Sequence, residues 1–112
     1  MHDASCIFCR IINREIPSNI VHETNELLAF VDVQPKAPIH LLIVPKIHVS
    51  SVNELKPEHE VLVGRMVLLA KELAKQQGVS ETGYRLMINT GEGAGQSVFH
   101  LHLHLLGGRH YD

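Results

Sequence analysis

The stretch His100-Leu101-His102-Leu103-His104-Leu105-Leu106 constrains the fold more than any other part of the sequence. Histidine and leucine alternate there with a period of two, the period of a β-strand, whose successive side chains point to opposite faces. The leucines at 101, 103 and 105 would share one face and the histidines the other, with neighbouring histidines about 7 Å apart. A single histidine on a strand is usually a surface or hydrogen-bonded residue. Three in strict alternation instead predict a surface of imidazoles backed by a hydrophobic wall.

The composition is ordinary for a globular protein and excludes several classes of partner. With 112 residues, 45% hydrophobic and 20% charged, residues 1–112 are predicted to form a single domain. The formal net charge of −2 and the absence of tryptophan argue against a nucleic-acid partner. No apolar run approaches the roughly 20 residues of a membrane helix, and the first residues lack the pattern of a signal peptide. We therefore expect a cytoplasmic protein that binds neither nucleic acid nor membranes.

Local patterns predict two helices and four further strands. Ser5 is placed to cap a short helix that runs to about Asn13, and Pro57 suits the first position of a long helix that ends near Gln77. Strands are predicted at residues 20–23, 27–31, 39–44 and 84–89, and the histidine strand is predicted to begin at Val98. The apolar run 39–44 is expected at the centre of the sheet. The fold class is therefore α+β, with a five-stranded antiparallel sheet, one long helix and one short helix.

The long helix at 57–77 carries more apolar surface than one sheet face normally covers. Its two adjoining apolar stripes consist of Leu62, Met66, Leu69 and Leu73, and of Val63, Val67, Ala70 and Ala74. The surplus could lie deep in the core, or it could pack against a second subunit. We favour a homodimer that uses this helix and the neighbouring strand.

The residues before and within the histidine strand suggest phosphate chemistry. A neutral imidazole is a good nucleophile, and attack on phosphorus would give a histidine–phosphate bond that water can later hydrolyse. The backbone N–H groups of a glycine-rich loop can hold phosphate oxygens. The loop from Gly91 to Ser97 runs directly into the histidine strand, so the loop and the imidazoles must be neighbours.

The pattern at 100–106 resembles the signature of the histidine-triad superfamily of nucleotide hydrolases and transferases, and the likeness to its Hint branch covers nearly the whole chain. The matching segments are Ile7-Phe8 through Glu15-Ile16-Pro17, Leu28-Ala29-Phe30-Val31-Asp32-Val33, Ala37-Pro38-Ile39-His40, Pro45-Lys46-Ile47-His48, Asn89, Gly95-Gln96-Ser97 and Leu106-Gly107-Gly108-Arg109. The resemblance implies a hydrolase of purine nucleoside phosphoramidates and related monophosphate conjugates, with adenosine as the expected nucleoside. Histidine at 104, where the transferase branch has glutamine, favours hydrolysis.

The resemblance also implies roles for individual residues. His102 would be the nucleophile that takes the nucleoside monophosphate, and His104 would contact the phosphate or the bridging atom. The carbonyl of His100 would fix the tautomer of His102, since a partner on one ring nitrogen decides which nitrogen is free. The phosphate site would be completed by His40, Asn89, Gly95, Gln96 and Ser97, with Ser97 also helping the leaving group.

The same resemblance implies an apolar nucleoside pocket. The base would lie among Ile7, Phe8, Ile11, Phe30 and Val33. Asp32 would accept hydrogen bonds from the ribose hydroxyls. Taken alone, each apolar residue could simply belong to the core, and Asp32 could be an ordinary turn residue. The resemblance of the whole set to the family favours the pocket.

Cys6, Cys9, His48 and His100 form a second group. A Cys-x-x-Cys pair on one helix face together with two histidines makes a suitable tetrahedral zinc site, and bacterial-type relatives resemble this pattern. Such a zinc ion would be structural, because no position is left for water. The alternative is that the two cysteines are reduced thiols in the core.

Two other functions are left open by the residues. His-x-His on a strand can chelate a catalytic zinc ion with a third ligand from elsewhere, which would make the protein a metallohydrolase that loses turnover on chelation. A nucleotide-binding protein without turnover is the third class. Replacement of His102 separates these readings.

Overall fold

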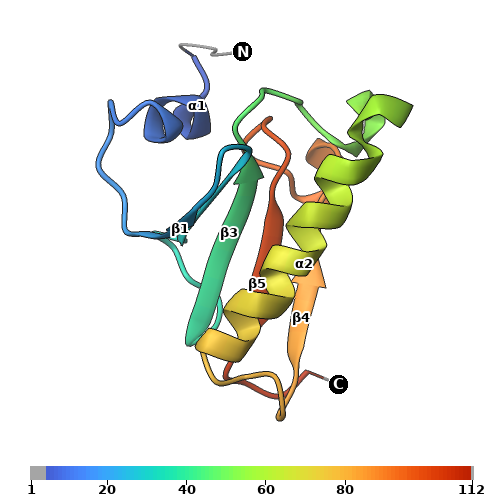
Figure 1. Ribbon diagram of the computed structural model, residues 1–112. Helices are drawn as coiled ribbons and strands as arrows, with labels where there is room; N and C mark the ends of the chain where they lie inside the picture. Colours follow the sequence, from blue (N-terminus) through green and yellow to red (C-terminus); the bar gives the residue numbers. More distant parts are fainter. Residues whose placement is uncertain (1–4, 112) are drawn as a thin grey trace.

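Residues 5–111 are described by the computed structural model, in which five strands form one antiparallel sheet (Figure 1). The strands are β1 (Ile20–Glu23), β2 (Leu27–Val31), β3 (Ile39–Pro45), β4 (Tyr84–Met87) and β5 (Leu103–Gly107). Their order across the sheet is β1-β2-β3-β5-β4, so β3 lies at the centre, as predicted. All four pairings are antiparallel, which confirms the predicted fold class.

The helices lie on opposite faces of this sheet (Figure 1). The long helix α2 (Glu60–Gln76) crosses one face, and the short helix α1 (Ile7–Ile12) lies near one end of the other face. The predicted boundaries need two corrections. Cys6, rather than Ser5, caps α1, because its Sγ accepts the backbone N–H of Cys9 at 3.3 Å. Pro57 opens a 3₁₀ turn (Pro57–His59) that precedes α2.

The alternation in the histidine segment divides the interior into two layers. The leucines at 101, 103 and 105 are buried in the core between the sheet and α2, which confirms the hydrophobic wall. The central strand β3 contributes to both layers: Leu41 and Ile43 pack under α2, whereas Leu42 and Val44 pack with α1 on the other face. The histidines therefore face the side of the sheet on which α1 lies.

The predicted start of the histidine strand at Val98 is wrong, because β5 begins only at Leu103. Leu103 pairs with Ile43 of β3, so an extended ladder would pair Leu101 with Pro45. Proline has no N–H to donate, and the ladder cannot continue there. Leu101 instead donates its N–H to the carbonyl of Val49 at 2.7 Å. β4 likewise ends at Met87 rather than at residue 89.

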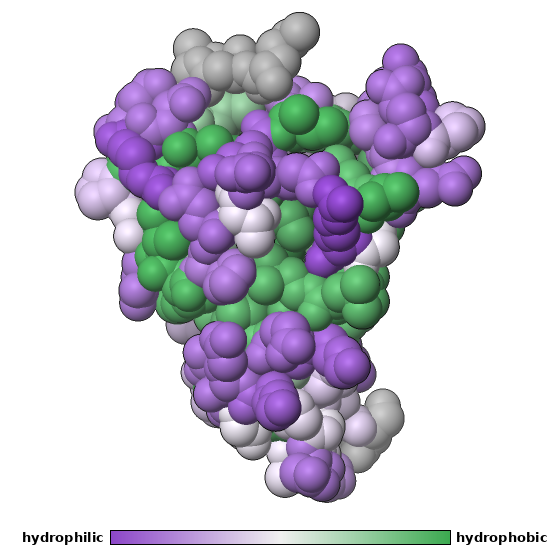
Figure 2. Space-filling model, viewed as in Figure 1, coloured by the Kyte–Doolittle hydropathy of each residue, from purple (hydrophilic) through white to green (hydrophobic). Residues whose placement is uncertain are grey.

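Part of the apolar surplus of α2 stays on the surface. Of the two predicted stripes, Ala70 and Ala74 are buried in the core together with Leu62, Met66 and Leu73, whereas Val67 is 45% exposed. Val61 and Leu68, which belong to neither stripe, are 61% and 62% exposed. Figure 2 shows hydrophobic surface over and beside α2 on this face of the molecule. Among the described residues, no helix has the length and apolar character that crossing a membrane requires.

Candidate active site and metal centre

A cavity of about 450 Å³ lies on the histidine face of the sheet. It is formed by α1, by the segments that follow β2 and β4, and by the glycine-rich loop before β5. Eleven of the residues expected at the site line it: Ile7, Phe8, Ile11, Phe30, Asp32, Val33, Asn89, Gly95, Ser97, His102 and His104. Segments that lie far apart in the sequence thus contribute to one mostly apolar hollow that also contains polar groups.

His102 lies in the cavity wall with one ring nitrogen already occupied. Its Nδ1 donates to the carbonyl oxygen of His100 at 2.7 Å, so in the neutral ring Nε2 carries the free lone pair. Burial lowers the pKa of His102, and the ring is therefore neutral at physiological pH. The edge of Phe8 packs against it, with ring centroids 5.1 Å apart. This arrangement presents a fixed, uncharged nitrogen nucleophile.

His104 is oriented by a relay of hydrogen bonds that begins at the backbone. The N–H of Lys36 donates to Nδ1 of His40 at 3.0 Å, so the proton of neutral His40 must be on Nε2. That Nε2 lies 2.9 Å from Nδ1 of His104 and donates to it. The proton of His104 is consequently on its own Nε2, which is buried and has no partner among the described residues. A buried donor without a partner is costly unless a ligand accepts from it.

The pKa of His104 is lowered to about 4, first by burial and second by the neighbouring His102 and His40; Lys36 acts in the same direction, and Asp32 opposes it. In the unfolded chain a histidine titrates near 6.5. Between pH 6.5 and 4 the unfolded chain therefore binds more protons, and the free energy of unfolding falls as the pH decreases. His104→Gln should make this fall shallower by up to about 1.4 kcal/mol per pH unit. Urea unfolding of both proteins at several pH values measures the two slopes, and equal slopes would contradict the assignment.

Asp32 lines the cavity and comes directly after β2. Its Oδ1 accepts the backbone N–H of Gln34 at 2.9 Å, and Oδ2 lies 3.3 Å from Nε2 of His40. The carboxylate is thus fixed in orientation and half-buried. Val33, beside it, is 88% exposed and can only form part of the rim.

Three of the expected site residues do not line the cavity. The rings of His40 and His100 lie behind it and act on its wall through His104 and through the carbonyl bonded to His102. Gln96 is buried, and its amide holds the glycine-rich loop: Oε1 accepts from Gly91 N–H at 2.8 Å, while Nε2 donates to the carbonyls of Ser50 and Val98. Gln96 thus shapes the loop from within, and its side chain does not line the hollow.

The cavity is also lined by residues that were not predicted to belong to the site. They are Ile16, Pro17, Ser18, Gln34, Lys36, Leu42, Met87 and Val98. Met87 and Leu42 lie directly opposite His104 in the two strands that flank β5. Knowledge of the strand register would have identified these two, because residues paired across strands share a face.

Cys6, Cys9, His48 and His100 meet behind the cavity with geometry suited to a tetrahedral metal ion. Cys9 Sγ lies 3.3 Å from His48 Nδ1 and 3.5 Å from His100 Nδ1, and the two Nδ1 atoms are 3.2 Å apart. A tetrahedral zinc ion with ordinary bond lengths requires S···N and N···N separations of about 3.6 and 3.4 Å. His100 Nε2 donates to the carbonyl of Pro45 at 2.7 Å, which leaves Nδ1 unprotonated toward the cluster.

Comparisons with known proteins find similar chains over nearly the whole sequence. Residues 5–112 match the family model described as "Scavenger mRNA decapping enzyme C-term binding". The chain is 50% identical over 103 residues to the purine nucleoside phosphoramidase of Escherichia coli K12. The matched region covers 92% of this chain and 87% of that protein. A solved HIT family hydrolase from Legionella pneumophila Philadelphia 1 superposes with a TM-score of 0.92 at 48% identity, covering 94% of each chain.

A second solved structure is described as zinc-bound. It is a histidine triad family protein from Mycobacterium smegmatis, with a TM-score of 0.81 and 29% identity, covering 96% of this chain and 78% of that one. The matches extend over nearly the whole sequence, including the histidine segment. The protein therefore belongs to the histidine-triad superfamily.

Proposed function

We propose that the protein hydrolyses purine nucleoside phosphoramidates, and related nucleoside monophosphate conjugates, through a covalent intermediate on His102. One observation carries the proposal: a neutral imidazole in the cavity wall has its Nδ1 bonded to a carbonyl and its Nε2 free. The relative that shares 50% of the sequence is named a purine nucleoside phosphoramidase, which supports the same substrate class.

The cavity offers a matching group for each part of such a substrate. The base packs against Phe8, Phe30 and the isoleucines of α1, and Asp32 accepts from the ribose hydroxyls. The phosphate receives a hydrogen bond from Nε2–H of His104, a donor that has no partner within residues 5–111. Asn89, Ser97 and Gly95 also line the cavity and complete the phosphate site.

The reaction proceeds in two displacements at phosphorus. Nε2 of His102 attacks, a bond from nitrogen to phosphorus forms, and the bond from phosphorus to the leaving nitrogen breaks. The leaving nitrogen takes a proton from a water molecule as this bond breaks, and the amine departs. The hydroxide that remains from the same water then attacks phosphorus, the bond to Nε2 breaks, and the nucleoside monophosphate is released with neutral His102 restored.

We further propose that Cys6, Cys9, His48 and His100 hold a structural zinc ion. Two sulfur and two nitrogen donors, all within 4.8 Å of one another, fit the preferences of zinc and fill its coordination. The zinc-bound relative from Mycobacterium smegmatis supports this choice of metal. Because the carbonyl of His100 holds the nucleophile, an ion that fixes this residue also stabilises the position of His102.

The geometry disfavours a catalytic metal held by the strand histidines. Asp32, His40 and His104 do bring three donor atoms together. However, both nitrogens of His40 are engaged, one by the N–H of Lys36 and the other by His104 at 2.9 Å. Two nitrogens bound to one zinc ion would lie about 3.4 Å apart, so this pair has the spacing of a hydrogen bond.

The direct test is an assay of adenosine 5′-phosphoramidate hydrolysis, with release of AMP and ammonia followed over time. Rapid quenching during turnover should trap a protein that carries one adenylyl group on His102, detectable as a mass increase on the peptide that contains it. A protein that binds AMP but releases no ammonia would be a nucleotide-binding protein, and the hydrolase assignment would be wrong.

We also propose a homodimer through α2 and the neighbouring edge strand β4. Val61 and Leu68 are two helical turns apart, lie on the outer side of α2, and expose apolar surface that the sheet does not cover. Leu68→Lys is expected to shift the protein toward monomer in analytical ultracentrifugation. Glu81→Lys, at an exposed position beyond the end of α2, is the matched surface control. A wild-type protein that sediments as a monomer at micromolar concentration contradicts the dimer.

A further inference from the structure

Within residues 5–111, three buried side-chain atoms that can form hydrogen bonds have no partner. They are Nε2 of His104, the hydroxyl oxygen of Tyr111 and Oγ of Ser18. Buried polar groups in folded proteins are normally paired, so each unpaired atom is a candidate for contact with a ligand. His104 lines the cavity, and its Nε2–H is the donor proposed for the substrate phosphate. The other two atoms have no role in the proposed reaction.

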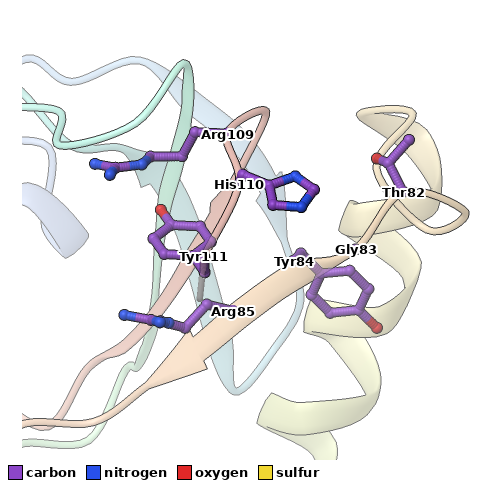
Figure 3. A pocket seen from close by; sticks show the side chains of 7 residues that line it. All are labelled: Thr82, Gly83, Tyr84, Arg85, Arg109, His110 and Tyr111. Carbon is purple, nitrogen blue, oxygen red and sulfur yellow. The ribbon is translucent and has the colours of Figure 1, made fainter.

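The hydroxyl of Tyr111 belongs to a different part of the molecule. Figure 3 shows the ring of Tyr111 between the guanidinium groups of Arg85 and Arg109, which lie 4.1 and 5.1 Å from its centroid. These side chains line a separate hollow of about 340 Å³, which shares no lining residue with the cavity of the reacting histidines. A nucleotide in that cavity therefore does not meet Tyr111.

Ser18, in contrast, lines the cavity itself and lies on its β1 side. The carbonyl of Asn19, the next residue, accepts the backbone N–H of Val31 at 3.0 Å. Ile20 then begins β1 and pairs with Phe30 of β2. Ser18 is therefore held beside the end of β2, on the side away from β5.

The strand order gives the direction in which a nucleotide lies in the cavity. His102 and His104 come just before and on β5, whereas Asp32, the proposed partner of the ribose, follows β2. Neighbouring strands lie about 4.8 Å apart, so β1 and β5, with β2 and β3 between them, are about 14 Å apart. A nucleoside monophosphate that makes a contact at each end has a comparable length. With phosphorus at His102, the far edge of the base therefore points toward β1 and Ser18.

The part of the cavity that would hold the base is apolar except at Ser18. Among the lining residues from α1, from the segment before β1 and from β2, Ser18 alone has a polar side chain; the others are Ile7, Phe8, Ile11, Ile16, Pro17 and Phe30. Apolar side chains can pack on the faces of a purine, but its edge carries N–H groups and lone pairs. Such groups need a hydrogen-bond partner when they leave water.

We propose that Oγ of Ser18 forms a hydrogen bond with the substituent at position 6 of the purine, which makes Ser18 a specificity-determining residue for the base. A serine hydroxyl both accepts and donates, so it can accept from the 6-amino group of adenine and donate to the 6-oxo group of guanine. The side chain turns about a single bond, which lets the covered hydroxyl rotate toward a bound base. This inference rests on the proposed function for the position of the nucleoside.

The test compares AMP with purine riboside 5′-monophosphate, which is AMP without its 6-amino group. Neither compound has a bond from phosphorus to nitrogen, so neither is consumed, and dissociation constants can be measured by calorimetry on the wild-type protein. AMP is expected to bind about fivefold more tightly than purine riboside 5′-monophosphate, because it gains one hydrogen bond. In Ser18→Ala the two ligands should bind equally well.

Asn19→Ala is the matched control. It changes the neighbouring residue, which is exposed and does not line the cavity, and it should keep the preference for AMP. Equal affinities in the wild-type protein, or a preference that survives in Ser18→Ala, overturns the contact with the base.

Melting temperatures separate this role from a structural one. Without ligand, Ser18→Ala should melt no lower than wild type, because within residues 5–111 the hydroxyl that it removes has no partner. Saturating AMP should raise the melting temperature of wild type more than that of the variant. A variant that melts several degrees lower and binds both ligands more weakly by the same factor would show that the hydroxyl supports the cavity instead of the base.

Hydrolysis of adenosine 5′-phosphoramidate tests the proposed function separately. Wild-type protein that binds AMP with the expected preference but does not cleave the phosphoramidate refutes the hydrolase and supports the contact at Ser18. Wild-type protein that cleaves the phosphoramidate but shows no preference for AMP refutes the contact alone.

Discussion

His102→Ala is expected to lower kcat/KM for adenosine 5′-phosphoramidate by about 10⁴-fold or more, which is typical of losing a covalent nucleophile. No other described side chain presents a ring nitrogen held by the His100 carbonyl and aimed into the cavity. His104 cannot replace it, because the relay from Lys36 through His40 leaves a proton on the nitrogen that His104 turns toward the substrate.

The controls for this variant separate chemistry from folding. His22→Ala removes a half-buried histidine on β1, outside the cavity, and should retain activity. Since the remaining cavity wall is unchanged, His102→Ala protein should still bind AMP, measured by calorimetry. Hydrolysis by His102→Ala at a rate close to wild type would show that another group attacks phosphorus.

The second large effect is expected at the metal cluster. Wild-type protein purified without chelators should contain about one zinc ion per chain, and Cys9→Ser should contain almost none. Cys9 is 1% exposed, and its sulfur lies within 3.5 Å of both histidine donors. Because the ion binds the folded state and not the unfolded chain, its loss should lower the melting temperature by about 10 °C or more.

Chelation provides the matched control for this variant. Removal of metal from wild-type protein should lower its melting temperature to a value near that of Cys9→Ser, and the chelator should leave the variant unchanged. A variant that is destabilised while wild type ignores the chelator would mean that Cys9 acts through core packing alone. Wild-type protein without zinc under gentle purification would refute the site.

Much of the fold follows from periodicity. The alternation of leucine and histidine at 100–106 requires one buried and one functional face, and the apolar run in β3 predicts a strand that is covered on both sides. The residues at which the strands begin and end were less predictable. Val98 reads as the start of a strand, but the ladder ends where Pro45 can no longer donate a hydrogen bond. Such an end depends on the partner strand, which local sequence does not specify.

The candidate site shows the same division. The histidine strand and the Cys-x-x-Cys pair stand out from the residues themselves, whereas Asp32 and Ser97 were named through the family resemblance. Apart from the cluster of Cys6, Cys9, His48 and His100, the contacts between distant segments could not be named in advance. Gln96 has the motif of a ligand-binding residue, yet its amide is used to hold the glycine-rich loop. Met87 carries no motif, and it lines the cavity because β4 pairs beside β5 and places it opposite His104.

The sequence by itself determined that this chain presents imidazoles on one face of a strand and leucines on the other, because side-chain direction in a strand depends only on position parity. Only the tertiary structure decided what each imidazole does. Backbone carbonyls at Pro45 and His100 and the N–H of Lys36 each engage one ring nitrogen, and hydrogen bonding at one nitrogen determines which nitrogen is left for chemistry. His100 thus faces the cysteines, His102 offers a lone pair, and His104 offers a proton donor.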